Sequence, residues 1–217
     1  MIGFVWCHGW GAGQSFWKKL PSSFDDHPHI YWNAGYFEPQ DTPDLDPSIR
    51  WIGVGHSLGF AKLVTSSVPW YKLISLGGFT RFSSEKVDGG ISSAVLTTMQ
   101  KNLRKNPSKT LLDFYAASGF PKEIFSEVID KDRLHEDLAL LKEIDCHETF
   151  IEKSIPTLAI ASESDPIVPW ALTLSSFQSF SHVQLIPIDH PGHGMGYYHA
   201  EECKKHIGGF IDDSFRQ

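Results

Sequence analysis

The chain has 217 residues, with 41% hydrophobic and 21% charged side chains, a composition typical of one soluble globular domain with a good-sized core. Its formal net charge of −7 argues against general nucleic-acid binding, which requires a basic face. No stretch approaches the roughly 20 consecutive apolar residues of a membrane span, and the three widely spaced cysteines are typical of a reducing compartment. We therefore expect a cytoplasmic monomer without a membrane or nucleic-acid partner.

Short apolar runs bounded by turn residues recur along the chain. They cover residues 2–7, 29–35, 50–56, 71–78, 156–162 and 183–189. Continuous apolar runs of this length are typical of strands buried on both faces, as in a parallel sheet. Helical patterns at 58–67, 171–180 and 200–215 would cover the two faces. We therefore predict an α/β fold with a mostly parallel sheet of about six strands.

This alternation of strand and helix patterns stops between residues 79 and 155, where the sequence predicts no convincing strand. The segments 92–103, 107–118, 121–130 and 132–144 all have the pattern of amphipathic helices. We predict that 79–155 forms a helical cap over the site, inserted into a core made of 1–78 and 156–217.

The segment between the second and third predicted strands is rich in residues that disfavour helix. The stretch EPQDTPDLDPSI, residues 38–49, contains three prolines and three aspartates. Proline removes a backbone donor and disrupts a helix interior. We therefore predict a bare loop here in place of a crossover helix.

The third predicted strand ends in GHSLG, residues 55–59, which is a G-x-S-x-G pattern between a strand and a helix. In a nucleophile elbow this pattern puts the serine on a strained turn, and the glycines let neighbouring backbone approach closely. We predict that Ser57 is a catalytic nucleophile. The alternative is that Ser57 only caps the helix that follows.

A serine nucleophile needs a base and an orienting carboxylate, in the chain order serine, acid, histidine for such a sheet. Asp165 lies in the turn after the fifth predicted strand, directly before a proline, and is preferred over the neighbouring Glu163. His193 lies between two glycines after the last predicted strand and is the preferred base, with His190 as a competitor. The roles of His190 and of His199, which we place at or in the final helix, stay open.

The early loop HGWG, residues 8–11, completes the predicted site. The oxyanion of acyl transfer needs two backbone N–H donors, one from the residue after the nucleophile and one from a loop after an earlier strand. We assign these donors to Leu58 and Trp10. The loop matches neither a dinucleotide-binding nor a P-loop pattern, which leaves a plain glycine-rich turn as the alternative.

Metal and cofactor sites are not predicted. His199, Cys203 and His206 could share one helix face, but their spacing matches no familiar zinc pattern. Cys7 is interpreted as a strand residue facing the core.

The motifs together resemble the α/β-hydrolases, and among them the pimeloyl-[acyl-carrier protein] methyl ester esterases of biotin synthesis. HGWG followed by FW, GHSLG, DPIVP and GHGMGYYHAEEC are similar to the family's oxyanion loop, elbow, acid turn and histidine loop. The stretches 78–103 and 134–158 resemble its cap. Two leading strands common in the superfamily are expected to be missing. The resemblance implies hydrolysis of that methyl ester through an acyl-enzyme, with an acyl-carrier protein as partner.

The remaining predicted contacts concern the acyl chain and its carrier. The aromatic residues Trp10, Phe79, Phe82, Phe114 and Tyr115 are candidates for an apolar acyl channel, with simple core packing as the default for those in the cap. A stretch without acidic residues, Val95 to Leu112, holds Lys101, Arg104, Lys105 and Lys109. It could bind an acidic carrier protein, or it could be a solvated helix face. Two alternatives to the implied function are a short-chain carboxylesterase or thioesterase with another substrate and a non-catalytic binding protein of the same fold.

Overall fold

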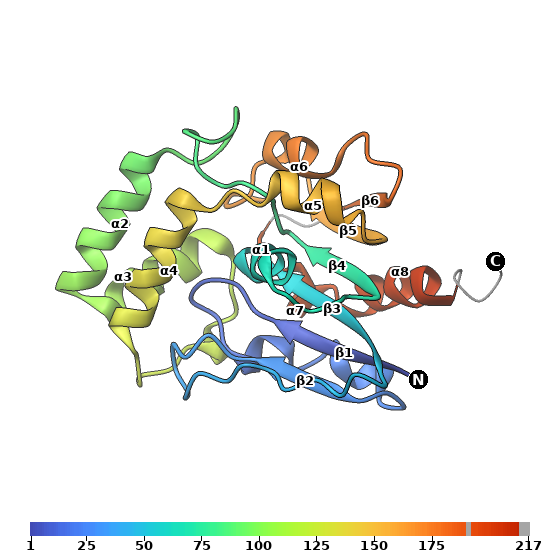
Figure 1. Ribbon diagram of the computed structural model, residues 1–217. Helices are drawn as coiled ribbons and strands as arrows, with labels where there is room; N and C mark the ends of the chain where they lie inside the picture. The colour runs from blue at the N-terminus through green and yellow to red at the C-terminus, as the bar shows by residue number, and fades with distance from the viewer. Residues whose placement is uncertain (190–191, 213–217) are drawn as a thin grey trace.

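The computed structural model describes residues 1–189 and 192–212 (Figure 1). Its centre is a six-stranded sheet in the order β2-β1-β3-β4-β5-β6, and all five strand pairings are parallel. The strands are β1 Ile2–Cys7, β2 His29–Trp32, β3 Arg50–His56, β4 Lys72–Leu76, β5 Thr157–Ser162 and β6 Val183–Ile188. The predicted parallel α/β sheet is confirmed, with strand bounds within a few residues of those expected.

The register of the sheet brings the carboxyl ends of the strands together along one side, across the strand direction. Cys7 pairs with Gly55, and His56 in turn pairs with Leu76. Leu76 also pairs with Ile160 near the end of β5. The loops that follow β1, β3, β4 and β5 therefore meet along this side, which is where ligands bind in open α/β sheets. β1 and β4 point toward the side on which α2, α3 and α4 lie (Figure 1).

Both faces of the sheet are covered, as an apolar parallel sheet requires. On one face lie α1 Leu58–Thr65, α5 His147–Lys153 and α6 Trp170–Phe177. They meet through the rings of Phe60, Phe150 and Phe177. On the other lie the 3-10 helices η1 Gln14–Trp17 and η2 Pro21–Phe24 and the helices α7 Met195–Tyr198 and α8 Ala200–Asp212. No helix among the described residues is both long and apolar enough to cross a membrane.

The connection between β2 and β3 contains no helix in residues 33–49, as the prolines predict. It follows the edge of the molecule and forms one isolated bridge, between Asn33 and Asp41. The loop instead makes local contacts, such as the hydrogen bond from the Ser48 N–H to the Asp46 carboxylate, 2.8 Å.

The segment inserted between β4 and β5 contains α2 Ser93–Lys105, α3 Pro107–Ser118 and α4 Lys131–Glu143, which lie together beside the sheet (Figure 1). α5 belongs to the same segment of sequence but packs on the sheet. Its Lys153 ammonium donates to the carbonyl oxygens of Val64 and Ser66 at the end of α1, both at 2.7 Å. The structure therefore places α2–α4, without α5, next to the strand ends.

The prediction of a helix over 121–130 is wrong, because only a short 3-10 helix, η3 Lys122–Ile124, forms there. The Ser126 hydroxyl exchanges hydrogen bonds with the backbone of Val128, and the Asp130 N–H donates to the Tyr36 carbonyl at 2.7 Å. Serine hydroxyls compete with helical backbone hydrogen bonds in this way. The segment is a connector that ties the helical insertion to the loop after β2.

Candidate active site

Ser57 sits on the sharp turn between β3 and α1. Its backbone has φ 53° and ψ −125°, a conformation that residues other than glycine rarely adopt, and the residue is 7% exposed. A Cβ atom at Gly55 would lie 2.4 Å from Phe60 Cα, and one at Gly59 would lie 2.1 Å from the Cys7 carbonyl oxygen. Glycine is therefore required at both positions, which is the steric arrangement of a nucleophile elbow.

Asp165 and His193 form a buried pair beside this turn. The His193 Nδ1–H donates to Asp165 Oδ2 at 2.6 Å, and both side chains are only 1% exposed. Asp165 Oδ1 accepts hydrogen bonds from the N–H groups of Ile167 and Val168, at 2.8 and 3.0 Å. Burial alone raises the pKa of Asp165, but the His193 imidazole and these N–H groups outweigh burial and lower the pKa below its usual value. Glu163 is exposed and does not take part.

The backbone of His193 is held from two sides. Its N–H donates to the carbonyl of Ser118 at 2.8 Å, and its carbonyl accepts from His56 Nε2 at 2.9 Å. The His56 and His193 rings lie 4.6 Å apart, and His56 directly precedes Ser57. His193 Nε2 is buried and makes no hydrogen bond within the described residues. This nitrogen is therefore available to accept a proton.

The other histidines near this loop have different positions. His190 lies outside the described residues. His199 lies between α7 and α8 with Nδ1 3.5 Å from the Glu202 carboxylate. The ring of His56 is fully buried, and burial lowers the pKa of His56 well below its ordinary value. His56 is thus neutral at physiological pH.

The HGWG loop forms a tight turn against the elbow. The Ala12 N–H donates to the Gly9 carbonyl at 3.3 Å, and Gly11 has φ 68°. A Cβ atom at Gly9 would lie 2.7 Å from Ser57 Cβ, so the turn touches the candidate nucleophile. Within the described part of the chain, the N–H groups of Trp10 and Leu58 donate no hydrogen bond. Both predicted oxyanion donors are therefore unpaired next to Ser57.

The buried His8 side chain holds this turn through hydrogen bonds on both ring nitrogens. The Ala34 N–H donates to His8 Nε2 at 3.2 Å, so the ring proton is on Nδ1, which donates to the Gly9 carbonyl at 3.0 Å. Burial lowers the pKa of His8 to about 4. His8 is therefore neutral, with one tautomer selected by its two partners.

An apolar pocket of about 160 Å³ opens at Ser57. Of the five predicted channel residues, Trp10, Phe82 and Phe114 line it. Phe79 packs behind Phe82 with ring centroids 4.6 Å apart, and Tyr115 points to the turn at Gly11. The sequence analysis did not name the other wall residues: Ile91, Val95, Leu96, Met99, Leu138, Leu141, Pro166 and Ile167. The five of these that lie on α2 and α4 have the spacing of ordinary core positions, so the sequence contained no signal to separate them.

The four basic residues assigned to carrier binding are all exposed, on α2 and at the start of α3. Lys109 forms an ion pair with Asp113 at 2.7 Å. Arg104 borders a depression with Lys131, Asp132, His135 and Glu136. The surface at this end of α2 is therefore of mixed charge.

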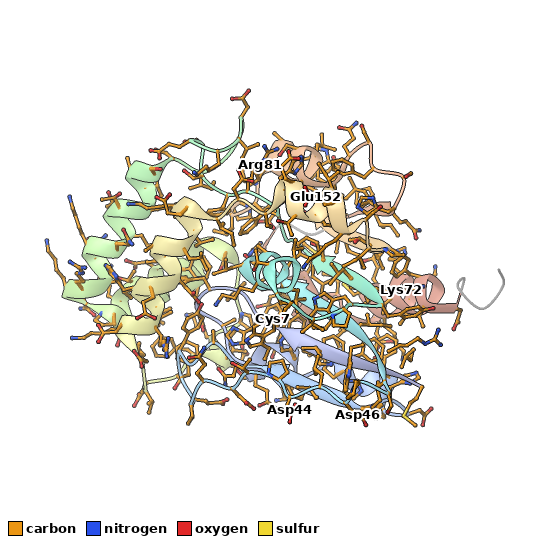
Figure 2. All side chains as sticks on the ribbon, in the orientation of Figure 1. Cys7, Asp44, Asp46, Lys72, Arg81 and Glu152 are labelled. Carbon is orange, nitrogen blue, oxygen red and sulfur yellow. The ribbon has the colours of Figure 1, made fainter. Side chains whose placement is uncertain are left out.

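The three cysteines are free and buried, and Figure 2 labels Cys7, the last residue of β1. Burial raises the pKa of Cys7 to about 12, so its thiol is not a nucleophile at neutral pH. In the described ranges, no cluster of three or more His, Cys, Asp or Glu side chains could hold a metal ion.

No family model matches the chain. Two curated relatives, both named pimeloyl-[acyl-carrier protein] methyl ester esterase, match nearly its whole length. The relative from Aliivibrio salmonicida is 23% identical over 97% of this chain and 93% of its own, and that from Vibrio parahaemolyticus is 23% identical over 96% and 94%.

Solved structures are similar over the same extent. An esterase from Exiguobacterium antarcticum has a TM-score of 0.80 at 14% identity, covering 98% of this chain and 92% of that one. A bromoperoxidase from Bacillus anthracis has a TM-score of 0.81 at 17% identity, covering 97% and 92%. The chain has the α/β-hydrolase fold. Within this fold, Ser57 follows β3, Asp165 follows β5 and His193 follows β6, the order expected for a catalytic triad on such a sheet.

Proposed function

We propose that the chain is a serine esterase and that its substrate is the methyl ester of pimeloyl-[acyl-carrier protein]. One observation carries the esterase proposal. Ser57 lies on a strained elbow at the end of an apolar pocket, next to the buried His193–Asp165 pair. The near full-length similarity to curated relatives of that name supports the choice of substrate.

The proposed mechanism is acyl transfer through a covalent intermediate. Ser57 Oγ attacks the ester carbonyl while His193 Nε2 accepts its proton. Asp165 keeps the His193 proton on Nδ1 and stabilises the imidazolium that forms. The N–H groups of Trp10 and Leu58 donate to the oxyanion. His193 gives its proton to the departing methoxide oxygen, so that methanol leaves, and then activates the water that releases the carboxylic acid.

The apolar lining of the pocket favours an acyl substrate whose reacting end carries no charge. All its lining residues other than Ser57 have apolar side chains, so a methylene chain can be buried there without leaving a polar group unpaired. A carrier protein would then remain outside the pocket. Lys101, Arg104 and Lys105 on α2, with Lys109 on α3, are the proposed contacts for its acidic surface.

The first experiment tests the nucleophile. A fluorophosphonate probe should label the native chain and the Ser108→Ala variant, in which an exposed serine of α3 is removed, and should not label Ser57→Ala. Absence of labelling in the native chain would contradict the serine-esterase proposal.

The second experiment tests the substrate. The purified chain should hydrolyse pimeloyl-[acyl-carrier protein] methyl ester, and its gene should restore growth without biotin in a strain that lacks its own esterase. Rapid cleavage of p-nitrophenyl esters without either result would instead support a short-chain esterase of other specificity.

A further inference from the structure

Tyr115 is a cap residue whose hydroxyl reaches the oxyanion turn. It lies on α3 and is buried, and its hydroxyl donates to the carbonyl of Gly11 at 2.7 Å. Burial raises the pKa of Tyr115 well above its usual value, so the hydroxyl keeps its proton and remains a donor. The aromatic ring is thus not at the pocket wall, and its polar atom has a defined partner.

The bonded carbonyl belongs to the turn that carries the Trp10 N–H. Gly9 and Ala12 close this turn, and Gly11 is its third residue, with φ 68°. A type II turn requires a positive φ at that position, and glycine reaches several other conformations at little cost. His8 holds the first carbonyl of the turn, at Gly9, but no residue of the loop itself holds the Gly11 carbonyl. Tyr115 supplies that restraint.

The carboxyl end of α3, which contains Tyr115, also contacts His193, the proposed base. The Ser118 carbonyl accepts the His193 N–H at 2.8 Å. The Phe120 ring lies parallel to the His193 ring, with 1° between the planes and 6.0 Å between centroids. The helix therefore contacts the oxyanion turn through Tyr115 and the histidine loop through its last residue, Ser118, with Phe120 just beyond its end. Within one rigid helix, these contacts set the position of one loop relative to the other.

We propose that Tyr115 is a positioning residue for the oxyanion hole, so that the cap takes part in transition-state stabilisation as well as lining the pocket. This inference rests on the proposed serine-esterase function. A donor aimed at the oxyanion acts mainly in the transition state, and it is effective only when it is held in place before the reaction. Loss of the restraint should therefore lower kcat without weakening binding of the ground-state substrate.

The test compares Tyr115→Phe with Tyr71→Phe. Tyr71 directly precedes β4, at the amino end of the strand, and its ring stacks on Arg50. The control therefore also removes a tyrosine hydroxyl, but far from the site. For a p-nitrophenyl ester, Tyr115→Phe should lower kcat about tenfold with KM unchanged. The inhibition constant of an alkylboronic acid, whose adduct on Ser57 mimics the tetrahedral intermediate, should rise by the same factor. Tyr71→Phe should match the native chain.

A purely structural role would lower the melting temperature of Tyr115→Phe and leave kcat and boronate inhibition unchanged, and that result would overturn the proposal. If Tyr115→Phe does not fold, two non-natural residues keep the ring volume. Replacement of Tyr115 by 4-aminophenylalanine retains a donor and should retain kcat, whereas 4-methylphenylalanine lacks one and should not. Equal kcat for the two would also overturn it. A native chain that neither turns over esters nor labels at Ser57 would instead remove the proposed function itself.

Discussion

At the scale of single residues, the candidate site depends on which atom of a side chain meets which partner. Asp165 is the clearest case, because its two oxygens have separate tasks. Oδ1 accepts the N–H groups of Ile167 and Val168, which orients the carboxylate, and Oδ2 accepts the His193 Nδ1–H. The hydrogen bond to Oδ2 thus keeps the proton of the neutral ring on Nδ1, which leaves Nε2 as the acceptor atom.

The Asp165→Asn variant should separate these tasks. Asparagine can keep the oxygen that accepts the turn N–H groups, but it presents an NH₂ group to His193 and selects the wrong tautomer. We expect kcat/KM for a p-nitrophenyl ester at neutral pH to fall on the order of 10³- to 10⁴-fold, with little change in melting temperature. Glu163→Gln is the matched control and should be unchanged. A similar loss in both variants would contradict the assignment of Asp165.

At the scale of elements, α4 is one of the helices that hold the segment between β4 and β5 against the rest of the molecule. The Trp10 indole donates to the Leu134 carbonyl at 2.8 Å. Asp137, three residues along α4, accepts the Tyr36 hydroxyl and pairs with the Lys62 ammonium of α1 at 2.5 Å. Both partners of the ion pair are largely buried, with 20% and 15% of their side chains exposed. The pair is therefore a structural link and not a surface ion pair.

Removal of this link should be far more damaging than removal of an exposed pair. Asp137→Ala leaves a cation and a hydroxyl without their acceptor, and we expect it to lower the free energy of unfolding by about 3 kcal/mol. Asp113→Ala breaks the exposed Lys109–Asp113 pair and should lower it by about 0.5 kcal/mol or less. Urea denaturation of both variants measures the difference. Equal losses would show that α4 is not held by Asp137.

At the scale of the whole molecule, two buried histidines make stability depend on pH. Burial lowers the pKa of His8 to about 4 and that of His56 well below its ordinary value. Below about pH 6.5 the unfolded chain binds protons at both residues, whereas the folded chain does not. Since the unfolded state then binds more protons, the free energy of unfolding falls as the pH falls. Asp165, whose folded pKa is lowered, contributes stability above its unfolded pKa, and this is lost only in more acidic solution.

We therefore expect the free energy of unfolding to be nearly constant between pH 7 and 8 and to fall between pH 6.5 and 5. In alkaline solution it should fall again, because burial raises the pKa of Cys7, Cys146 and Cys203 to about 12 and only the unfolded chain then loses these protons. Two histidines that are charged only in the unfolded state give a limiting slope of about 2.7 kcal/mol per pH unit. Urea denaturation at half-unit intervals measures this slope. The double variant His8→Asn, His56→Gln should have a flatter profile even if it is less stable at pH 7.5. An equally steep fall in the double variant would assign the effect to other groups.

Much of the fold was predictable because its signals are local. A run such as Ile2–Cys7 is apolar at every position, and burial on both faces of a parallel sheet is the arrangement that suits it. The prolines of 38–49 exclude a helix by their own geometry. The helix predicted over 121–130 does not form, because the Ser126 hydroxyl bonds the Val128 backbone and the Asp130 N–H donates to the Tyr36 carbonyl. The second of these partners is remote in sequence, and no local pattern reveals it.

By itself, the sequence determined the six strands, the elbow at Ser57 and the chain order of the candidate triad, since backbone geometry and side-chain pattern specify these over a few residues. The tertiary structure alone decided that α5 packs against α1 and that Tyr115 bonds to Gly11, 104 residues away. These contacts join segments remote in sequence. They exist only after the sheet has formed and the segment between β4 and β5 has packed beside it, and no local preference encodes them.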